Sequence, residues 1–230
     1  MKLLRKLRRR AGNQPADDPP DPRTPWPTQP VPADAAAAAG QFWHAWQELL
    51  PDVSAALGDR EPQRVEHRMC AAVALLHPRL QFSLERGQRA AYALVISGQE
   101  DPELRPYTDA WLAAAPAEDA TWEYHDSVPA VPDPTEVTVN LGDHRIALAD
   151  VRVRATVDTA HGVVDVAVHH PALAQLDAAS RSAMTFLPLD ATLGERAAAE
   201  HLGHVDVVDT EPSDSLGLLQ LRELVEQLRR

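Results

Sequence analysis

Four residues near the C-terminus have side chains and a spacing that could support catalysis. Asp190 and Glu195 form an Asp-x-x-x-Gly-Glu pattern, which is followed by His201 and His204. Two carboxylates held close together can act as general acid and base, and a zinc site needs about four convergent nitrogen, oxygen or sulfur ligands. These four residues therefore define one functional hypothesis, a small hydrolase or a metal-dependent enzyme.

A structural explanation of the same four residues is favoured. Asp190 is well placed to cap a following helix, with Glu195 in the first turns of that helix. Gly203 is expected to end the helix between His201 and His204, so that the two imidazoles would not share a face. We therefore expect no catalytic residue, no metal and no cofactor.

The remaining reactive residue types form no complete catalytic signature. Ser97 follows a predicted strand but lacks a Gly-x-Ser-x-Gly pattern, and the chain has no phosphate-binding glycine loop and no His-Glu-x-x-His. His169 and His170 are adjacent on a strand, so their side chains face opposite sides and cannot chelate together. Cys70 occupies an apolar helical position typical of a buried thiol. Because Cys70 is the only cysteine, the chain cannot form an internal disulfide, and this fits a reducing cytoplasm.

A basic N-terminus gives the clearest functional clue, and it concerns location. The first ten residues contain six basic side chains: Lys2, Arg5, Lys6, Arg8, Arg9 and Arg10. The chain has 22 basic and 34 acidic residues, a formal charge of −12, so the part after Arg10 carries −18. Leu3, Leu4 and Leu7 share one side of a helical projection, so the segment could rest weakly on an anionic membrane surface. A disordered, solvated N-terminus is the favoured interpretation of this segment, with membrane contact as the alternative, and the acidic body argues against nucleic-acid binding.

Composition predicts a disordered arm followed by one domain. Eight prolines lie between positions 15 and 32, and such a stretch cannot build a core. We expect residues 1–34 to be a disordered basic and then proline-rich arm, and 35–230 to be a single globular domain. No stretch approaches the roughly 20 apolar residues of a membrane span, and no apolar run follows the basic N-terminus as a secretory signal would require.

The hydrophobic pattern predicts an α+β fold. Apolar residues at helical spacing indicate helices over 35–57, with a kink or break at Pro51, and over 173–186, 190–201 and the C-terminus. Alternation indicates strands over 80–84, 151–157 and 164–168. A continuous apolar run indicates a more buried strand over 91–97, and a further strand is predicted over 121–125. Predicted hairpins outnumber crossover units, which favours a largely antiparallel sheet packed against helices, with a mixed sheet as the alternative.

Several segments resemble a family of small uncharacterised bacterial proteins of actinobacterial type. The segments are HPRLQFSLE at 77–85, AYALVISGQEDPELRPYTDAWLAAAP at 91–116, TWEYH at 121–125 and LDATLGE at 189–195. The family shares His-Pro-x-Leu, Leu-Val-Ile-Ser and Leu-Gly-Glu segments, and the resemblance covers most of residues 40–210. It implies no activity, so it assigns no catalytic residue.

Two functional hypotheses follow. The favoured one is a non-catalytic bacterial accessory or protein-interaction domain with an unknown protein partner. This domain would be cytoplasmic and steered to the inner membrane face by its basic N-terminus. The alternative is the enzyme that would use the acid and histidine cluster. Convergence of Asp190, Glu195, His201 and His204 on one pocket would distinguish the two.

Overall fold

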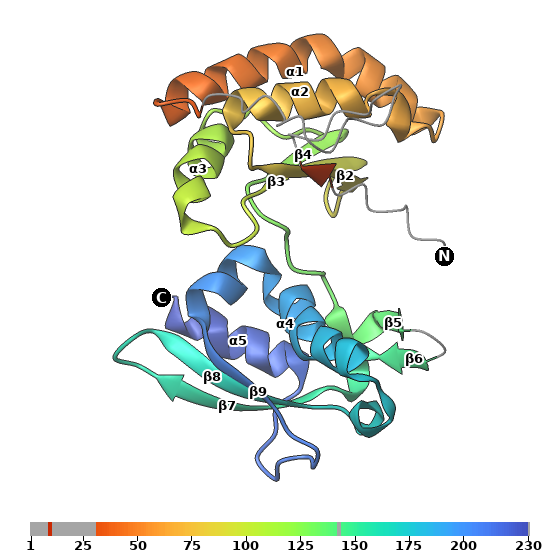
Figure 1. Ribbon diagram of the computed structural model, residues 1–230, viewed down its shortest axis with the longest axis vertical. Coiled ribbons are helices and arrows are strands. Elements are labelled where there is room, and N and C mark those ends of the chain that lie inside the picture. The colour runs from red at the N-terminus through yellow and green to blue at the C-terminus, as the bar shows by residue number, and fades with distance from the viewer. Residues whose placement is uncertain (1–8, 11–30, 142–143, 230) are drawn as a thin grey trace, which may run out of the picture. The chain divides into compact units, whose positions relative to one another are not determined.

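The chain folds into two compact units, each with its own hydrophobic core. The computed structural model describes residues 9–10, 31–141 and 144–229 (Figure 1). Unit 1 is Met1–Val128 and unit 2 is Pro129–Arg230. The helices and mostly antiparallel sheets of the described residues confirm the predicted α+β class. Where we expected one domain over 35–230, the division falls at a proline-rich loop that carries Pro129, Pro132 and Pro134.

Unit 1 contains a mixed sheet of strand order β1-β2-β3-β4. The strands are β1 (Arg9–Arg10), β2 (Gln81–Arg86), β3 (Tyr92–Ser97) and β4 (Trp122–His125). The predicted hairpin of β2 and β3 is confirmed, since the two strands pair antiparallel. Helix α3 (Arg105–Ala113) then crosses over to β4, which pairs parallel with β3.

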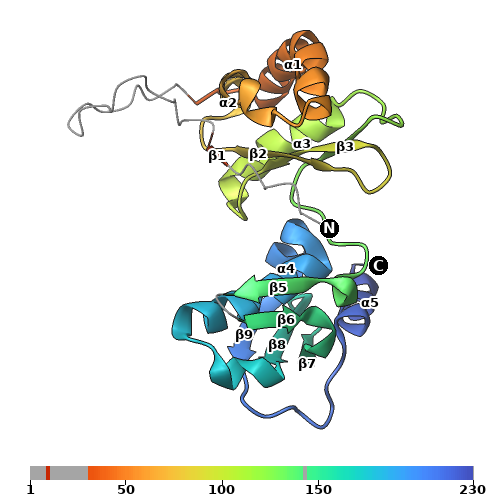
Figure 2. The ribbon, with the colours of Figure 1, turned by 90° about the vertical axis from the view of Figure 1, so that its right-hand side faces the viewer.

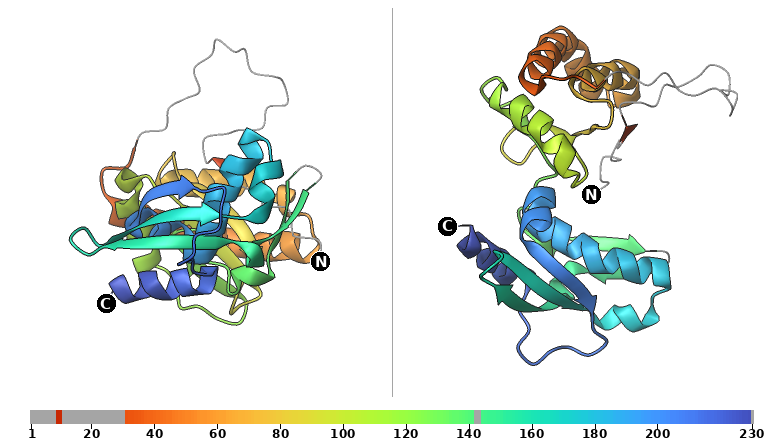
Figure 3. Two further views of the ribbon diagram at one scale, coloured as in Figure 1. Left: turned by 90° about the horizontal axis from the view of Figure 1, so that it is seen from below. Right: turned by 60° about the vertical axis from the view of Figure 1, so that its left-hand side comes forward.

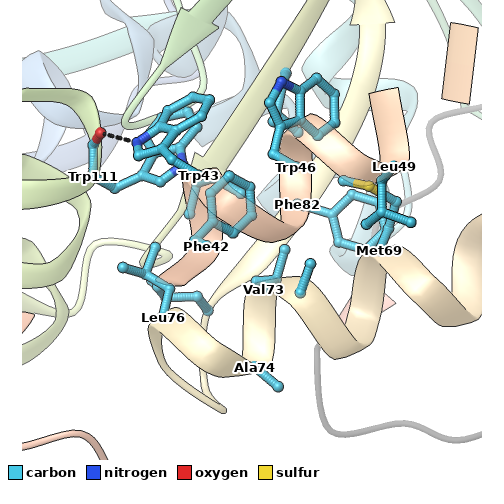
Figure 4. Close-up of a cluster of buried hydrophobic side chains, with 14 of the residues drawn as sticks. Phe42, Trp43, Trp46, Leu49, Met69, Val73, Ala74, Leu76, Phe82 and Trp111 are labelled. Atoms are coloured by element: carbon cyan, nitrogen blue, oxygen red, sulfur yellow. Dashed lines mark hydrogen bonds between the residues drawn. The ribbon is translucent and has the colours of Figure 1, made fainter. Parts of the chain in front are cut away.

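Three helices cover one face of this sheet with a core rich in aromatic side chains. Helix α1 (Ala35–Gly58) begins at Asp34, whose carboxylate accepts hydrogen bonds from the first backbone N–H groups, and α2 (Glu66–Leu76) packs beside it (Figure 1). Figure 4 shows side chains from α1, α2 and the sheet interleaved in this core. Trp43 stacks on Trp111 with ring centroids 5.1 Å apart, and its indole N–H donates to the Trp111 carbonyl at 2.8 Å.

The predicted break at Pro51 does not occur, because α1 runs through this proline as one helix. Pro51 lies on the exposed side of α1. Its missing N–H leaves the Gln47 carbonyl, also at an exposed position, without an intrahelical donor. Water can satisfy a carbonyl at such a position, so the buried side of the helix stays intact.

Unit 2 repeats the arrangement of a hairpin followed by a helical crossover to a parallel strand. Strands β7 (Arg152–Asp158) and β8 (Val163–His169) pair antiparallel as predicted, and β9 (Leu202–Val207) pairs parallel with β8. Helices α4 (Ala178–His201) and α5 (Leu218–Leu228) pack beside this sheet (Figure 3). A separate antiparallel pair is formed by β5 (Thr138–Leu141) and β6 (His144–Ala147). The sequence showed no repeat, because the two units share strand order but not side chains.

Most of the predicted N-terminal arm lies outside the described residues, but its described positions contact unit 1. The backbone of Arg9 and Arg10 pairs with β2 at the edge of the sheet (Figure 2). The Tyr107 hydroxyl donates to the Pro32 carbonyl at 2.6 Å. These attachments of the arm to unit 1 were not predicted.

Candidate functional site

The two predicted acidic residues lie on α4, on either side of a backbone break. Asp190 was expected to cap a helix, but it lies inside α4, and the residue that caps α4 is Asp177, whose carboxylate accepts from the Ser180 N–H at 2.7 Å. The break is at Gly194, which is buried and has φ 76° and ψ 163°. Only glycine adopts this conformation readily, so the Gly-Glu pattern marks a backbone requirement.

The break at Gly194 leaves α4 carbonyls without helical donors, and distant residues supply replacements. The Ala191 carbonyl accepts from the Val131 N–H at 2.8 Å. The Thr192 carbonyl accepts from Arg222 Nε on α5, also at 2.8 Å. The same guanidinium donates to the carbonyls of Pro132 and Val131. The Leu189–Glu195 segment of α4 is therefore a junction at which hydrogen bonds join α4, α5 and the loop at residues 131–132.

The two predicted histidine ligands make separate contacts. His201 ends α4, and its Nδ1 lies 3.1 Å from the Gly162 carbonyl. His204 is in β9, is largely exposed, and has Nε2 3.1 Å from Asp206. Within residues 9–10, 31–141 and 144–229, no group of three metal-ligating side chains occurs. The described structure therefore does not assemble the ligand set that the metal alternative requires.

A buried acid–imidazole pair that the sequence did not predict lies on β4 of unit 1. The Glu123 side chain is 1% exposed and its Oε1 lies 3.0 Å from His125 Nε2. Its two carboxylate oxygens also accept the backbone N–H groups of Gln88, Arg89 and Ala90 at 2.7 to 3.0 Å. Burial opposes ionisation, but these hydrogen bonds outweigh it and lower the pKa of Glu123 to about 2.

Local sequence explains how this carboxylate reaches the β2–β3 turn. Trp122 and Tyr124 face the aromatic core, so Glu123 and His125 lie on the opposite face of β4. At the turn, a Cβ on Gly87 would lie 2.5 Å from the Ala90 carbonyl, so only glycine allows the chain to fold back there. In the sequence, this pair could have been recognised from the alternation of Glu123 and His125 with the aromatic residues Trp122 and Tyr124. With three backbone donors, Glu123 acts mainly as a clamp on residues 88–90.

The predicted anionic-surface residues are partly described. Of the six basic residues, Lys2, Arg5, Lys6 and Arg8 lie outside the described residues, and Arg9 and Arg10 form β1. Their backbone pairs Arg9 with Phe82 and Arg10 with Gln81. No helix in the described part of the chain is long and apolar enough to cross a membrane. The edge of β2 is therefore where the structure connects the basic segment to unit 1.

Comparisons with known proteins do not identify a family. No protein-family model, no curated protein and no solved structure matches the chain. The resemblance to small bacterial proteins therefore stays an expectation, and function must be argued from the residues described above.

Proposed function

We propose that this protein is a non-catalytic bacterial accessory protein. It binds a protein partner in the cytoplasm and is drawn to the inner membrane face by its basic N-terminal segment. One observation carries this proposal. Six positive charges occupy the first ten residues of a chain whose remainder carries −18. A segment of this kind is attracted to anionic lipid, while the acidic remainder is repelled by it.

Three polar groups with buried or specific contacts stabilise local backbone, which agrees with a non-catalytic role. Glu123 holds the β2–β3 turn, and Arg222 holds the junction at Gly194. Asp165 on β8 accepts the His204 N–H at 2.7 Å and lies against Gly203, where a Cβ would clash with it. In each case folding explains the polar group.

The energy contributed by each basic side chain and the screening by salt together determine the expected strength of membrane contact. Each basic side chain near an anionic surface contributes about 1 kcal/mol, and three leucines add little buried area. Since the screening length shrinks from about 10 Å at 0.1 M salt to about 3 Å at 1 M, the contact is expected to be weak and salt-sensitive. Such an arm concentrates the protein at a surface and leaves partner choice to the folded units.

Sedimentation with vesicles tests the proposal. The full chain should sediment with vesicles of phosphatidylcholine and phosphatidylglycerol at low salt, and remain in solution with phosphatidylcholine alone. Deletion of residues 1–10, or replacement of the six basic residues by glutamine, should abolish sedimentation. As a matched control, substitution of exposed Arg60 and Arg229 by glutamine should leave it unchanged. Equal sedimentation of the full and shortened chains would refute the proposal.

A further inference from the structure

Strand β7 of unit 2 has an outer edge that is covered at only one described residue. Its inner edge pairs with β8 along its whole length (Figure 1). On the outer edge, Val153 exchanges backbone hydrogen bonds with Leu216 at 2.9 and 2.7 Å. Because Val153 bonds outward, alternation along the strand turns the N–H and C=O groups of Ala155 and Val157 outward as well. Within the described part of the chain, these groups have no partner strand.

The open part of this edge has a centre of symmetry at Thr156. It begins after Val153 and ends at Asp158, where β7 itself ends. A second copy that runs antiparallel about a two-fold axis at Thr156 places Ala155 opposite Val157 of that copy. Each such pair can exchange both N–H···O bonds, because the groups involved point outward. An axis at Thr156 therefore uses the whole open stretch.

The side chains of this stretch are complementary across the same axis. Arg154 lies opposite Asp158 of the second copy, and Thr156 lies opposite its own counterpart. Opposite charges and threonine pairs are favourable at directly opposed positions of antiparallel strands, whereas like charges are destabilising. Moving the axis by two residues along the strand would place either the two arginines or the two aspartates opposite each other. The charges therefore favour one register.

Contacts within the chain leave both charged groups able to bind across the axis. Arg154 is exposed and has no ion pair among the described residues, although the chain carries a formal charge of −12. The Asp158 carboxylate accepts the N–H groups of Ala160 and His161 at 3.0 and 3.2 Å, and lies 2.7 Å from Nδ1 of His161. A carboxylate has about four acceptor positions, so one is left for a guanidinium.

We infer that the outer edge of β7 binds the same edge of a second copy of this chain, about a two-fold axis at Thr156. The two three-stranded sheets then join into one continuous sheet. This inference goes beyond the proposed function and does not depend on the basic N-terminal segment. The contact is short, so we expect a weak dimer of the class whose interfaces bury less than about 1,200 Å².

Sedimentation velocity of the full chain tests dimerisation directly. The weight-average mass should rise above the 25.2 kDa of one chain as the protein concentration is raised. A chain lacking residues 1–10 should behave in the same way, which separates this inference from the proposed function. A chain that stays monomeric up to its solubility limit would overturn the inference. Loss of the dimer on deletion of residues 1–10 would do the same, because the contact would then lie elsewhere.

Reversal of one charge tests the predicted pairing. We expect Arg154→Glu to weaken the dimer by about tenfold or more, because both opposite-charge pairs become like-charge pairs. Arg145→Glu, the same change at an exposed site on β6, is the matched control and should leave the dimer unchanged. If Arg154→Glu dimerised as tightly as the parent protein, the assigned pairing would be wrong.

A mixture of two charge variants tests the register. Asp158→Lys should also dimerise poorly alone, and circular dichroism checks that the variant folds. When it is mixed with Arg154→Glu, the new glutamate of one variant meets the new lysine of the other, and the native Arg154 and Asp158 meet as before. The mixture should therefore dimerise as readily as the parent protein. Two folded variants that fail to associate would contradict the inference.

A cysteine cross-link tests the position of the axis without altering either charge. Thr156→Cys is introduced together with Cys70→Ala, which removes the buried native thiol. Position 156 opposes itself in a closely spaced pair, so a disulfide between two copies should form readily on oxidation. Thr138→Cys, at an exposed threonine of β5, is the control and should cross-link slowly. Equal rates for the two cysteine variants would overturn the assigned axis.

Discussion

Arg222 on α5 donates from Nε to the backbone carbonyl of Thr192 on α4, 2.8 Å away, next to the break at Gly194. Its two terminal nitrogens donate to the carbonyls of Val131 and Pro132. One guanidinium thus joins α5, α4 and the start of unit 2. The planar fork of arginine suits three carbonyls at fixed positions, which a lysine ammonium could not reach together.

Loss of this guanidinium should destabilise unit 2. We expect Arg222→Ala to lower the free energy of unfolding by about 2–3 kcal/mol, because hydrogen bonds from charged groups contribute more than neutral ones. Arg222→Lys should recover less than half of the loss. Urea unfolding followed by circular dichroism measures both. Arg229→Ala, an exposed substitution just after α5, is the control and should have little effect.

Replacement of Gly194 should also lower the stability of unit 2, but through backbone strain and not through lost hydrogen bonds. With φ 76° and ψ 163°, an alanine at this buried position would be strained by about 1–3 kcal/mol. Gly40→Ala is a control with the opposite sign, because Gly40 is an exposed residue inside α1 and a Cβ there meets nothing within 4 Å. That substitution should stabilise α1 by about 0.5–1 kcal/mol. If both variants unfolded like the parent protein, the assigned backbone strain would be wrong.

The features predicted correctly from the sequence depend on short-range patterns. Alternation of apolar residues predicted β2, β7 and β8, a continuous apolar run predicted β3, and the turns between these strands predicted two hairpins. The junction at Gly194 could not be predicted, because Arg222 reaches carbonyls 90 and 91 positions away in the chain. The clamp formed by Glu123 was missed for the same reason, since its backbone donors precede it by 33 to 35 positions.

The Asp190 prediction shows the limit of local capping rules. An aspartate before a helical stretch is a good N-cap, and the pattern predicted separate helices over 173–186 and 190–201. In the structure α4 continues through Pro188, and the Thr192 hydroxyl donates to the Pro188 carbonyl at 2.6 Å. Leu189 and Leu193, which flank this turn of α4, are buried in the unit 2 core, and such packing favours a helix that continues through the proline. Tertiary packing therefore decided where the helix begins.

Acid should weaken unit 1 through Glu123. The pKa of Glu123 is about 2 in the folded chain against an ordinary value of 4.5, so its ionised form stabilises the folded state above pH 4.5. That contribution, about 3 kcal/mol, is lost as the pH falls from about 4.5 to about 2. Glu123→Gln should remove this part of the pH dependence and lower stability at neutral pH, because an amide nitrogen would face backbone donors.

Tryptophan fluorescence measures this prediction for unit 1, because all five tryptophans precede residue 129. The unfolding free energy is compared between the parent protein and Glu123→Gln across the acid range. Glu48→Gln, at a largely exposed site on α1, is the control and should keep the parent's acid dependence. Parallel acid curves for the parent and Glu123→Gln would contradict the role assigned to this carboxylate.

Mildly acidic pH should weaken unit 1 through His77. Burial lowers the pKa of His77 below its ordinary value of 6.5, and nearby Arg79 adds to the effect. The unfolded chain therefore takes up a proton before the folded chain does, so stability is full above pH 6.5 and falls as the pH drops through the folded-state pKa. Neutral His77 also accepts the Arg79 N–H at Nδ1, 3.1 Å away, and its ring lies 4.8 Å from that of Tyr107.

His77→Asn separates protonation from hydrogen bonding, because the asparagine oxygen can accept the same Arg79 N–H without titrating. We expect this variant to lose less stability than the parent protein between about pH 7 and pH 5, measured by fluorescence-detected urea unfolding. His44→Asn, at an exposed site on α1, should follow the parent. If His77→Asn and the parent lost stability equally over this range, protonation of another group would have to account for the loss.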